Sequence, residues 1–493
     1  MALTKVLSTL LDLRSNTNQA DSNTVAGIDA LLNTPAAPPS GQDSQKNTAF
    51  GYETLKANDL GYANVAVGYQ ALKVANTLSA TAQTAVGANA LALSTTGGGN
   101  TAIGYDACYK NTTGTANVAM GKGALYSNNT GSYNIAIGLD AFGTGTFPAA
   151  GKSGDYNVAI GTNAMTQAIN SDDNVAIGNQ ASISQLTLSQ TVAIGSGALQ
   201  GDANLTATNN ATATTAVGFR AGYIAGAAFN NNTLLGAYTG YFCATGDENV
   251  AVGTSALYGG SGTQTFSSNV AVGFQSMYNA TSAGDNVAIG KSSLFNAGNT
   301  TGSVAVGLDS LYTAGNGSLN NTGVGNSAGK FISTGDNNTC LGYFAGTNAS
   351  PFNITTENNR VVVGDSNVTN AYIQVAWTVI SDQRDKVEIE DATYGLDFIS
   401  KLRTVKFKRD NRNRYESGVS DGSKKDEKYT FGFLAQNIIE AEKACGATDE
   451  TLLIADNEDA NNLKVVETSV IPALVKAMQE LKAEFDAYKA SHP

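Results

Sequence analysis

The sequence predicts a mainly β protein, in which a long β-solenoid or β-roll of about 17-residue repeats precedes a smaller α+β domain that ends in a coiled-coil helix. Three observations predict this organisation. A glycine-containing motif recurs from residue 47 to residue 366, charged residues concentrate after residue 380, and the C-terminal segment carries apolar residues at helical spacing. A fixed short period over many copies is the signature of a solenoid.

The repeat has the pattern Asn-Val-Ala-Ile-Gly-x-x-Ala-Leu. Ten of the 17 intervals between its glycines equal 17 residues. Val, Ala and Ile favour extended backbone, glycine permits a tight turn, and a stack of coils buries the apolar face that one coil cannot. Stacking would place each Asn over the next, so we expect an amide hydrogen-bond ladder. The motif glycines are Gly51, Gly68, Gly87, Gly104, Gly121, Gly138, Gly161, Gly178, Gly195, Gly218, Gly236, Gly253, Gly273, Gly290, Gly307, Gly325, Gly342 and Gly364.

This motif resembles the repeat in the heads of trimeric autotransporter adhesins, a left-handed β-roll built by three chains. The resemblance covers residues 47–366 and implies a homotrimeric roll, although the period here is longer than in that head. At about 4.8 Å per stacked coil, 18 coils would extend on the order of 85 Å. We therefore expect a shaft.

Four segments follow from this pattern. They are an N-terminal head (residues 1–46), the repeat shaft (47–366), a connecting strand (367–380) and a C-terminal domain (381–493). Within the head, Leu3 to Leu11 has the apolar spacing of a short amphipathic helix. The head is either a frayed terminus or an anchor to a larger particle. Ala371 to Trp377 reads as the connecting strand.

The concentration of charged residues after residue 380 supports the boundary before the C-terminal domain, and the net charge argues against a nucleic-acid partner. The net charge is −12, from 29 basic and 41 acidic residues, and an acidic chain disfavours a nucleic-acid partner. No segment approaches the roughly 20 apolar residues that span a bilayer. The four cysteines lie far apart and are expected to be free thiols. We expect no cofactor and no metal site.

The C-terminal domain opens with Ser381-Asp382-Gln383-Arg384-Asp385-Lys386. Serine is a weak nucleophile until a base removes its proton, and a lysine can act as that base. The only histidine is His492, so no Ser-His-Asp triad is available. The alternative interpretation of this stretch is a charged surface turn.

The stretch is similar to the Ser-Asp-x-Arg-x-Lys self-cleavage motif of the intramolecular chaperone domain of endosialidases and phage tail spikes, the S74 peptidase family. The resemblance continues through Tyr394–Phe407, Phe431–Gln436 and Val470–Leu481. It implies that Ser381 is the nucleophile, Lys386 the base and Ser381–Asp382 the bond that is cut, while Asp382 and Arg384 orient the loop. Two residues depart from the family pattern, Asp385 in place of an apolar residue and Asn437 in place of an acid.

The last segment carries an apolar seam with spacings of 3, 4, 3, 4 and 3, formed by Ile471, Leu474, Met478, Leu481, Phe485 and Tyr488. Such a seam packs against identical helices in a coiled coil. It predicts a trimerisation device. The alternative is an amphipathic helix packed on a monomeric core.

The function that these features favour is a homotrimeric tail fibre, tail spike or comparable appendage that contacts a host surface. Its expected partners are a virion tail or baseplate at the N-terminus and a host receptor, either a glycan or an outer-membrane component. Receptor contacts are expected in the longer intervals, 139–160, 196–217, 254–272 and 343–363. Such a protein would be made in the host cytoplasm and reside in the virion.

Two other functions remain open at this point. A bacterial trimeric surface adhesin would be expected to carry a signal peptide and a membrane barrel, which the sequence does not indicate. A capsule-depolymerising tail spike would need two carboxylates held together, and the repeats contain no recurrent acidic pair. The expected enzymatic activity is therefore limited to self-cleavage.

Overall fold

The computed structural model describes residues 22–32, 45–75, 79–143, 152–201, 210–226, 229–260, 264–315, 317–347, 352–374, 379–457 and 463–492. The chain forms two compact units. The first comprises Met1–Phe344 and Ile354–Val361, and the second comprises Ala345–Asn353 and Val362–Pro493. The amphipathic helix expected over Leu3–Leu11 and the expected end of the connecting strand, Trp377, lie outside the described residues.

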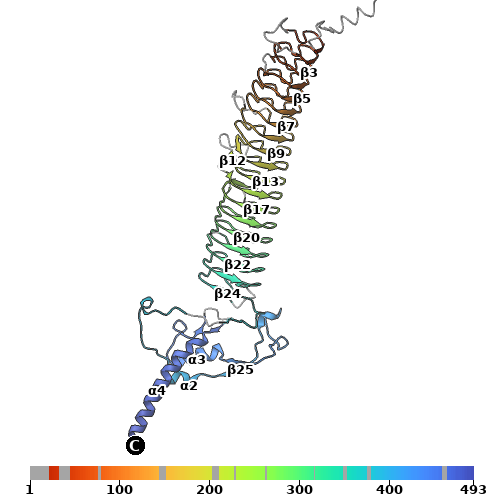
Figure 1. Ribbon diagram of the computed structural model, residues 1–493. Coiled ribbons are helices and arrows are strands. Elements are labelled where there is room, and N and C mark those ends of the chain that lie inside the picture. Colours follow the sequence, from red (N-terminus) through yellow and green to blue (C-terminus); the bar gives the residue numbers. More distant parts are fainter. Residues whose placement is uncertain are drawn as a thin grey trace, which may run out of the picture. The chain divides into compact units, whose positions relative to one another are not determined.

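The first unit is a β-solenoid, which confirms the predicted fold class. Each coil contributes a short strand that pairs in parallel with the strand of the next coil, giving a 19-stranded sheet (Figure 1). Ile135 of one coil, for example, lies opposite Val118 of the coil before it. The strands of this sheet are β1 (Thr24–Ala26), β2 (Thr48–Phe50), β3 (Val65–Val67), β4 (Thr84–Val86), β5 (Thr101–Ile103), β6 (Val118–Met120), β7 (Ile135–Ile137), β8 (Val158–Ile160), β9 (Val175–Ile177), β11 (Val192–Ile194), β13 (Thr215–Val217), β15 (Thr233–Leu235), β17 (Val250–Val252), β19 (Val270–Val272), β20 (Val287–Ile289), β21 (Val304–Val306), β22 (Thr322–Val324), β23 (Thr339–Leu341) and β24 (Val361–Val363).

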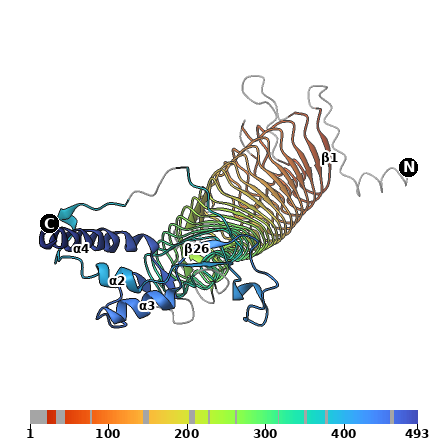
Figure 2. The same ribbon diagram turned by 90° about the horizontal axis from the view of Figure 1, so that it is seen from below.

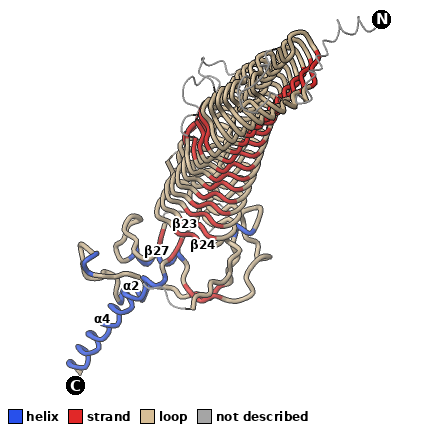
Figure 3. The backbone as a smooth tube through the Cα atoms, turned by 45° about the horizontal axis from the view of Figure 1, so that its top comes forward, coloured by secondary structure: helices blue, strands red, loops and turns tan. Residues whose placement is uncertain are grey.

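A second, shorter row of strands lies along another side of the coils between residues 187 and 265 (Figure 3). One parallel sheet has three strands and the other has two. They are β10 (Thr187–Ser189), β12 (Asn210–Thr212) and β14 (Phe229–Asn230), then β16 (Cys243–Thr245) and β18 (Gln264–Thr265). Of these extra strands, β12 and β18 lie in longer intervals of the repeat, whereas β10 and β16 lie in intervals of 17 residues.

The interior of the solenoid is narrow and is filled by small residues. The middle residue of each triplet in the main sheet points inward, as Ala119 and Ala136 do with no exposed surface. The segment after the glycine supplies a second buried pair, such as Ala124 and Leu125. Because the inward residue is alanine in most coils, the two sides of a coil can approach closely, and the coils superpose when viewed along the stack (Figure 2). The four cysteines are free thiols, as expected.

The motif asparagines form the expected amide ladder. Asn134 donates its backbone N–H and its side-chain Nδ2 to Oδ1 of Asn117 in the previous coil, at 3.0 and 3.1 Å. The same Nδ2 donates to the carbonyl of Gly154 at 2.8 Å. A buried amide without partners would be costly, so this ladder fixes which coil position stacks on which. In five coils another residue takes the asparagine position, namely Gln83, Thr191, Thr214, Ser303 and Arg360.

The solenoid contains one coil before residue 47, where the sequence predicted its start. Strand β1 pairs with β2, so that Thr24 lies opposite Thr48. An ion-pair network joins the first coils, because Lys56 contacts Asp29 at 3.4 Å and Glu53 at 2.5 Å. Hydrogen bonding to Lys56 lowers the pKa of Glu53 to about 2. The missed signal was Asn23-Thr24-Val25-Ala26-Gly27, which carries the motif with valine at the inward position.

The second unit has the expected α+β composition. It contains helices α2 (Leu396–Lys401), α3 (Ala435–Ala444) and α4 (Val470–Ser491), and the 3-10 turns η1 (Gln383–Asp385), η2 (Arg412–Arg414) and η3 (Glu467–Ser469). Its antiparallel pairs are β25 (Val405–Phe407) with β26 (Thr430–Gly432), and β27 (Ala455–Asp456) with β28 (Lys464–Val465). No strand forms over the described part of the expected connection, residues 367–374, where the residues are exposed. None of the helices among the described residues is long and apolar enough to cross a membrane.

A buried carboxylate organises the core of this unit. Glu442 has no exposed surface and accepts hydrogen bonds from the backbone N–H groups of Leu453, Ile454 and Ala455 at 2.7 to 3.0 Å. These bonds attach the chain at the start of β27 to α3. Burial raises the pKa of the neighbouring Tyr394 to about 12, and the negative charge of Glu442 contributes in the same direction.

The motif glycine supports a specific mutational prediction. Gly104 has φ +141°, and a Cβ built there would lie 2.4 Å from the carbonyl oxygen of Gly121 in the next coil. Both the dihedral and the close approach exclude a side chain. We therefore expect Gly104→Ala to destabilise the shaft by more than about 3 kcal/mol, at the severe end for overpacking, as measured by guanidinium unfolding.

Gly99→Ala is the matched control for this substitution. Gly99 also has a positive φ, +69°, but a Cβ there would meet nothing closer than 3.8 Å. The equivalent position of the next coil is Ala116, at φ +53°. Gly99→Ala should therefore cost about 1 kcal/mol or less. Equal effects of the two substitutions would contradict the close-approach explanation.

A lysine lies inside the solenoid, opposite Asn128 of the previous coil. Lys152 is 4% exposed, and its Nζ donates to the carbonyl of Thr166 at 2.6 Å and lies 5.0 Å from the ring centroid of Phe142. Burial lowers the pKa of Lys152 to about 7 from 10.5. The depressed pKa means that the folded state binds this proton less tightly than the unfolded state.

Burial of Lys152 therefore lowers the free energy of unfolding by its full amount below pH 7, and this loss of stability disappears as the pH rises toward 10.5. We expect Lys152→Met to raise the melting temperature at pH 7, and the gain to shrink at pH 9 to 10. Lys110→Met, at an exposed lysine, should show no such pH-dependent gain. A gain for Lys152→Met that is constant with pH would contradict the prediction.

Candidate active site

A short 3-10 turn brings Ser381 and Lys386 together at the start of the C-terminal domain. Asp382 precedes this turn, η1, and its Oδ1 accepts a hydrogen bond from the backbone N–H of Arg384 at 2.9 Å. The backbone N–H of Lys386 donates to the carbonyl of Gln383 at 3.1 Å and closes the turn. The chain therefore reverses direction within five residues, which places the two ends of the motif side by side.

The side chains of Asp382 and Arg384 reinforce this turn. Nη2 of Arg384 lies 2.7 Å from Oδ2 of Asp382, and Nε donates to the same carboxylate. The Arg384 guanidinium lowers the pKa of Asp382, and the carboxylate in turn raises the pKa of Arg384. Asp382 and Arg384 therefore bind each other within the turn, and neither hydrogen-bonds Ser381 or Lys386 through its side chain in the described structure.

The candidate pair, Ser381 and Lys386, is in hydrogen-bond contact. Nζ of Lys386 lies 2.5 Å from Oγ of Ser381 and 3.4 Å from the carbonyl oxygen of the same residue. A general base must lie within hydrogen-bond reach of the proton that it removes, and Lys386 meets this requirement. After taking the proton, the ammonium would also lie near the carbonyl oxygen of the Ser381–Asp382 bond.

The pair lies at the surface of the single chain. Ser381 and Lys386 are both exposed, and so are the apolar residues on either side, Ile380 and Val387, at 86% and 87%. Desolvation disfavours the charged ammonium and is one of the effects that leave a lysine in the neutral form that can accept a serine proton. The described residues of this chain do not enclose the pair, so such desolvation would have to come from another surface.

The two departures from the family motif have different surroundings. Asp385 is exposed and ends η1 directly before Lys386. Asn437 lies in the first turn of α3, where its Nδ2 is 3.4 Å from Oε2 of Glu440 and its buried Oδ1 has no hydrogen-bond partner. No contact joins Asn437 to the Ser381–Lys386 pair among the described residues. Asp385 is thus the departure that adjoins the candidate chemistry.

The six seam residues all lie on the exposed side of α4. Their exposed fractions run from 44% for Leu474 to 65% for Met478, and five of them line one apolar groove along the helix. The opposite side of α4 packs on the domain through Val470, Ala473 and Ala477. Glu480 also accepts a hydrogen bond from Leu396 N at the start of α2, at 2.6 Å. The seam therefore does not pack on the core of its own chain.

The sequence analysis missed a second apolar surface, on the shaft. The third residue of each strand in the main sheet points outward, and many of these residues are large and apolar. We call this set the outer stripe; it comprises Phe50, Val67, Ile103, Met120, Ile137, Leu235, Ile289, Val324 and Leu341, each 37–41% exposed. The signal was present in the motif, because Val-Ala-Ile places apolar side chains on both faces of a strand.

The comparisons with known proteins concern the C-terminal domain. Residues 381–447 match the peptidase S74 family, which is described as chaperone of endosialidase. The match begins at Ser381, the first residue of the candidate site. A comparison with curated proteins found no match. The chain thus carries a C-terminal domain of the chaperone-of-endosialidase family, which together with the β-solenoid fits a tail-fibre-like protein.

Proposed function

We propose that this chain is a homotrimeric tail fibre, tail spike or comparable appendage protein that attaches to a host surface, and that its C-terminal domain drives trimerisation and folding and then cuts itself off. The observation that carries the proposal is the contact of 2.5 Å between Lys386 Nζ and Ser381 Oγ at the start of the family match. A stack of nearly identical coils is prone to slip in register. A removable device that aligns the chains would answer that problem.

The proposed cleavage uses the two groups of the pair. Neutral Lys386 takes the proton of the Ser381 hydroxyl, and the Ser381 oxygen forms an ester bond to the carbonyl carbon of Ser381 while the C–N bond to Asp382 breaks. The protonated amine then delivers the proton to the departing backbone nitrogen, and water completes the hydrolysis. Because nucleophile, base and target belong to one short turn, their effective concentration can reach about 10⁵ M or more.

Two surfaces support the homotrimer. The α4 seam has the spacing of a coiled coil and lies away from its own domain. The outer stripe offers a second apolar surface that continues from coil to coil along the shaft. A soluble protein rarely leaves contiguous apolar surface of this extent uncovered. Two further copies of the chain would cover both surfaces at once.

Attachment at both ends of the appendage is part of the proposal. The N-terminal segment would join the virion tail or baseplate, and residues 1–21 lie outside the described residues. Host contacts would come from the longer intervals, since the regular coils differ little from one another. Parts of those intervals, residues 144–151, 202–209, 261–263 and 348–351, also lie outside the described residues.

Self-cleavage can be tested directly by mutation. Since 112 of the 493 residues of this 50.6 kDa chain follow Ser381, cleavage should release a fragment of about 12 kDa. Ser381→Ala and Lys386→Ala should leave the chain intact. Lys386→Arg should do the same, because arginine keeps the charge but does not act as a base. Mass spectrometry of the products is the measurement.

Lys425→Ala, at an exposed lysine of the same domain, is the control and should be cut like the wild type. Asp382 is the expected first residue of the fragment, and a fragment that begins with Ser381 would move the cut to the preceding bond. A wild-type chain that forms trimers but stays intact after long incubation would refute self-cleavage.

Trimerisation through the seam is tested by placing charges in it. Leu474→Asp combined with Leu481→Asp would bury unpaired charges in a coiled-coil core, at a cost of several kcal/mol for each ion. We expect this variant to yield aggregates in place of soluble trimers, although no shaft residue has changed. Sedimentation measures the outcome.

Ala483→Asp combined with Ala487→Asp is the matched control, because both alanines are exposed on α4 outside the seam. This control variant should assemble like the wild type. Normal amounts of soluble trimer from the seam variant would contradict a role of the α4 seam in trimerisation.

A further inference from the structure

The compact unit that holds the candidate active site also contains chain from before the expected cut. Residues 345–353 and 362–381 precede the Ser381–Asp382 bond, yet they belong to the same unit as residues 382–493. Cleavage would therefore divide one packed unit into two pieces of chain. The contacts that cross this division decide whether the pieces separate at once.

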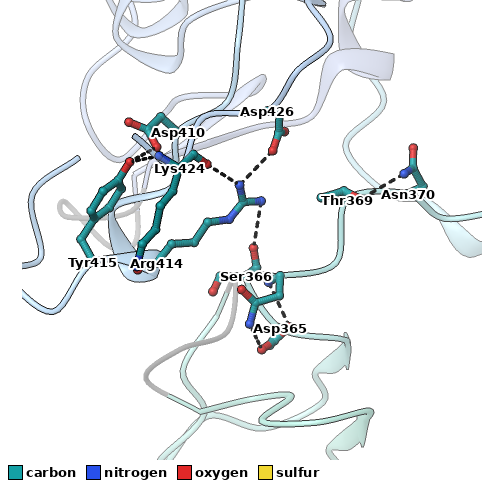
Figure 4. Close-up of polar contacts among 10 residues, drawn as sticks. Asp365, Ser366, Thr369, Asn370, Asp410, Arg414, Tyr415, Lys424 and Asp426 are labelled. Carbon is teal, nitrogen blue, oxygen red and sulfur yellow. Dashed lines mark hydrogen bonds and ion pairs between the residues drawn. The ribbon is translucent and has the colours of Figure 1, made fainter. Parts of the chain in front are cut away.

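The first such contact joins Ser366 to Arg414 (Figure 4). Asp365 and Ser366 are 7% and 8% exposed. Asp365 accepts hydrogen bonds from the backbone N–H and the side chain of Asn367, at 3.0 and 2.8 Å, and so holds a turn at this point. Nη2 of Arg414 points at the carbonyl oxygen of Ser366, at 3.5 Å.

Arg414 is held in place from the other side. Its Nη1 lies 2.8 Å from Oδ1 of Asp426 and donates to the carbonyl of Lys424 at 3.0 Å. The loop that carries it is closed by Tyr415, whose hydroxyl donates to Asp410 at 2.6 Å and accepts from the backbone N–H of Lys424 at 2.7 Å (Figure 4). The guanidinium is therefore fixed before it meets Ser366, so little side-chain freedom is lost on contact.

The second contact joins Phe352 to Lys464. Nζ of Lys464 lies 4.3 Å from the ring centroid of Phe352, within the range of a cation–π interaction. Asp456 of β27 holds the same ammonium at 3.3 Å. In both contacts the cation belongs to residues 382–493, and a neutral acceptor belongs to the shaft side of the cut.

We propose that the severed C-terminal domain remains bound to the shaft through Arg414 and Lys464, so that release is a step separate from cleavage. This inference rests on the proposed cut at Ser381–Asp382. The partner of the severed domain is the shaft end of this same chain, at Phe352 and Ser366. In a trimer three such pairs of contacts would act together and prolong the retention.

The test separates retention from self-cleavage. A Ser381→Ala chain with a specific protease site inserted after Ile380 can be cut without the Ser381–Lys386 pair. After cutting, the about 12 kDa piece should co-elute with the shaft in size-exclusion chromatography. Its dissociation rate is then measured by repeating the separation over time.

Variants on each side of the cut identify the contacts. Lys464→Met, Phe352→Leu and Arg414→Lys should each speed dissociation, by about tenfold if each contact contributes the 1.4 kcal/mol that corresponds to that factor. Lys464→Met and Phe352→Leu together should speed it by less than the product of the single effects, because they remove the same interaction. Lys425→Ala is the control and should dissociate like the parent chain. Melting of the uncut variants checks that the domain is folded.

Each outcome is decisive. Immediate loss of the piece from the parent chain would overturn retention, and unchanged rates in all three variants would overturn the assignment to Arg414 and Lys464. A wild-type chain that never cuts itself, alongside a protease-cut chain that retains the piece, would overturn the proposed self-cleavage and leave the contacts standing.

Discussion

The close approach of successive coils at the motif glycine is the constraint on which the shaft depends. A Cβ at Gly104 would lie 2.4 Å from a carbonyl oxygen of the next coil, and the other motif glycines repeat this situation along the stack. That approach sets the coil spacing, which in turn brings each motif asparagine within hydrogen-bond distance of the next. The inward residue is alanine in most coils, although Leu234 occupies the same position in β15.

A shaft built in this way has a well-packed interior, but its coils are so alike that the sequence only weakly determines which coil pairs with which. Every coil offers its neighbours the same backbone pattern, and most coils offer the same asparagine; the exceptions are Gln83, Thr191, Thr214, Ser303 and Arg360. Pairing between distant segments is also slow to form. The C-terminal unit has its own core, centred on Phe398 and Ile438, which is built from segments that do not repeat one another. This difference gives a physical reason for joining the two kinds of structure in one chain.

In the C-terminal unit, by contrast, the candidate active site and the α4 seam are exposed to solvent. The Ser381–Lys386 pair, the apolar residues beside it and the α4 seam are all exposed in the single chain. The side of α4 that faces its own domain is made of Val470 and alanines, so the large apolar residues are reserved for another surface. Both the Ser381–Lys386 pair and the α4 seam are thus open to a second surface, which a single chain does not supply in the described structure.

The sequence by itself determined the repeat and the asparagine ladder, because these depend on local patterns of period and composition. It placed the first coil too late, since Val25 at the inward position disguised the motif around Gly27, and it expected a strand over residues 371–374 that is not formed there. Only the tertiary structure decided that the seam faces away from its domain and that Arg414 reaches Ser366, which is distant in sequence. Such contacts depend on how separate segments pack, and no local pattern of residues encodes that packing.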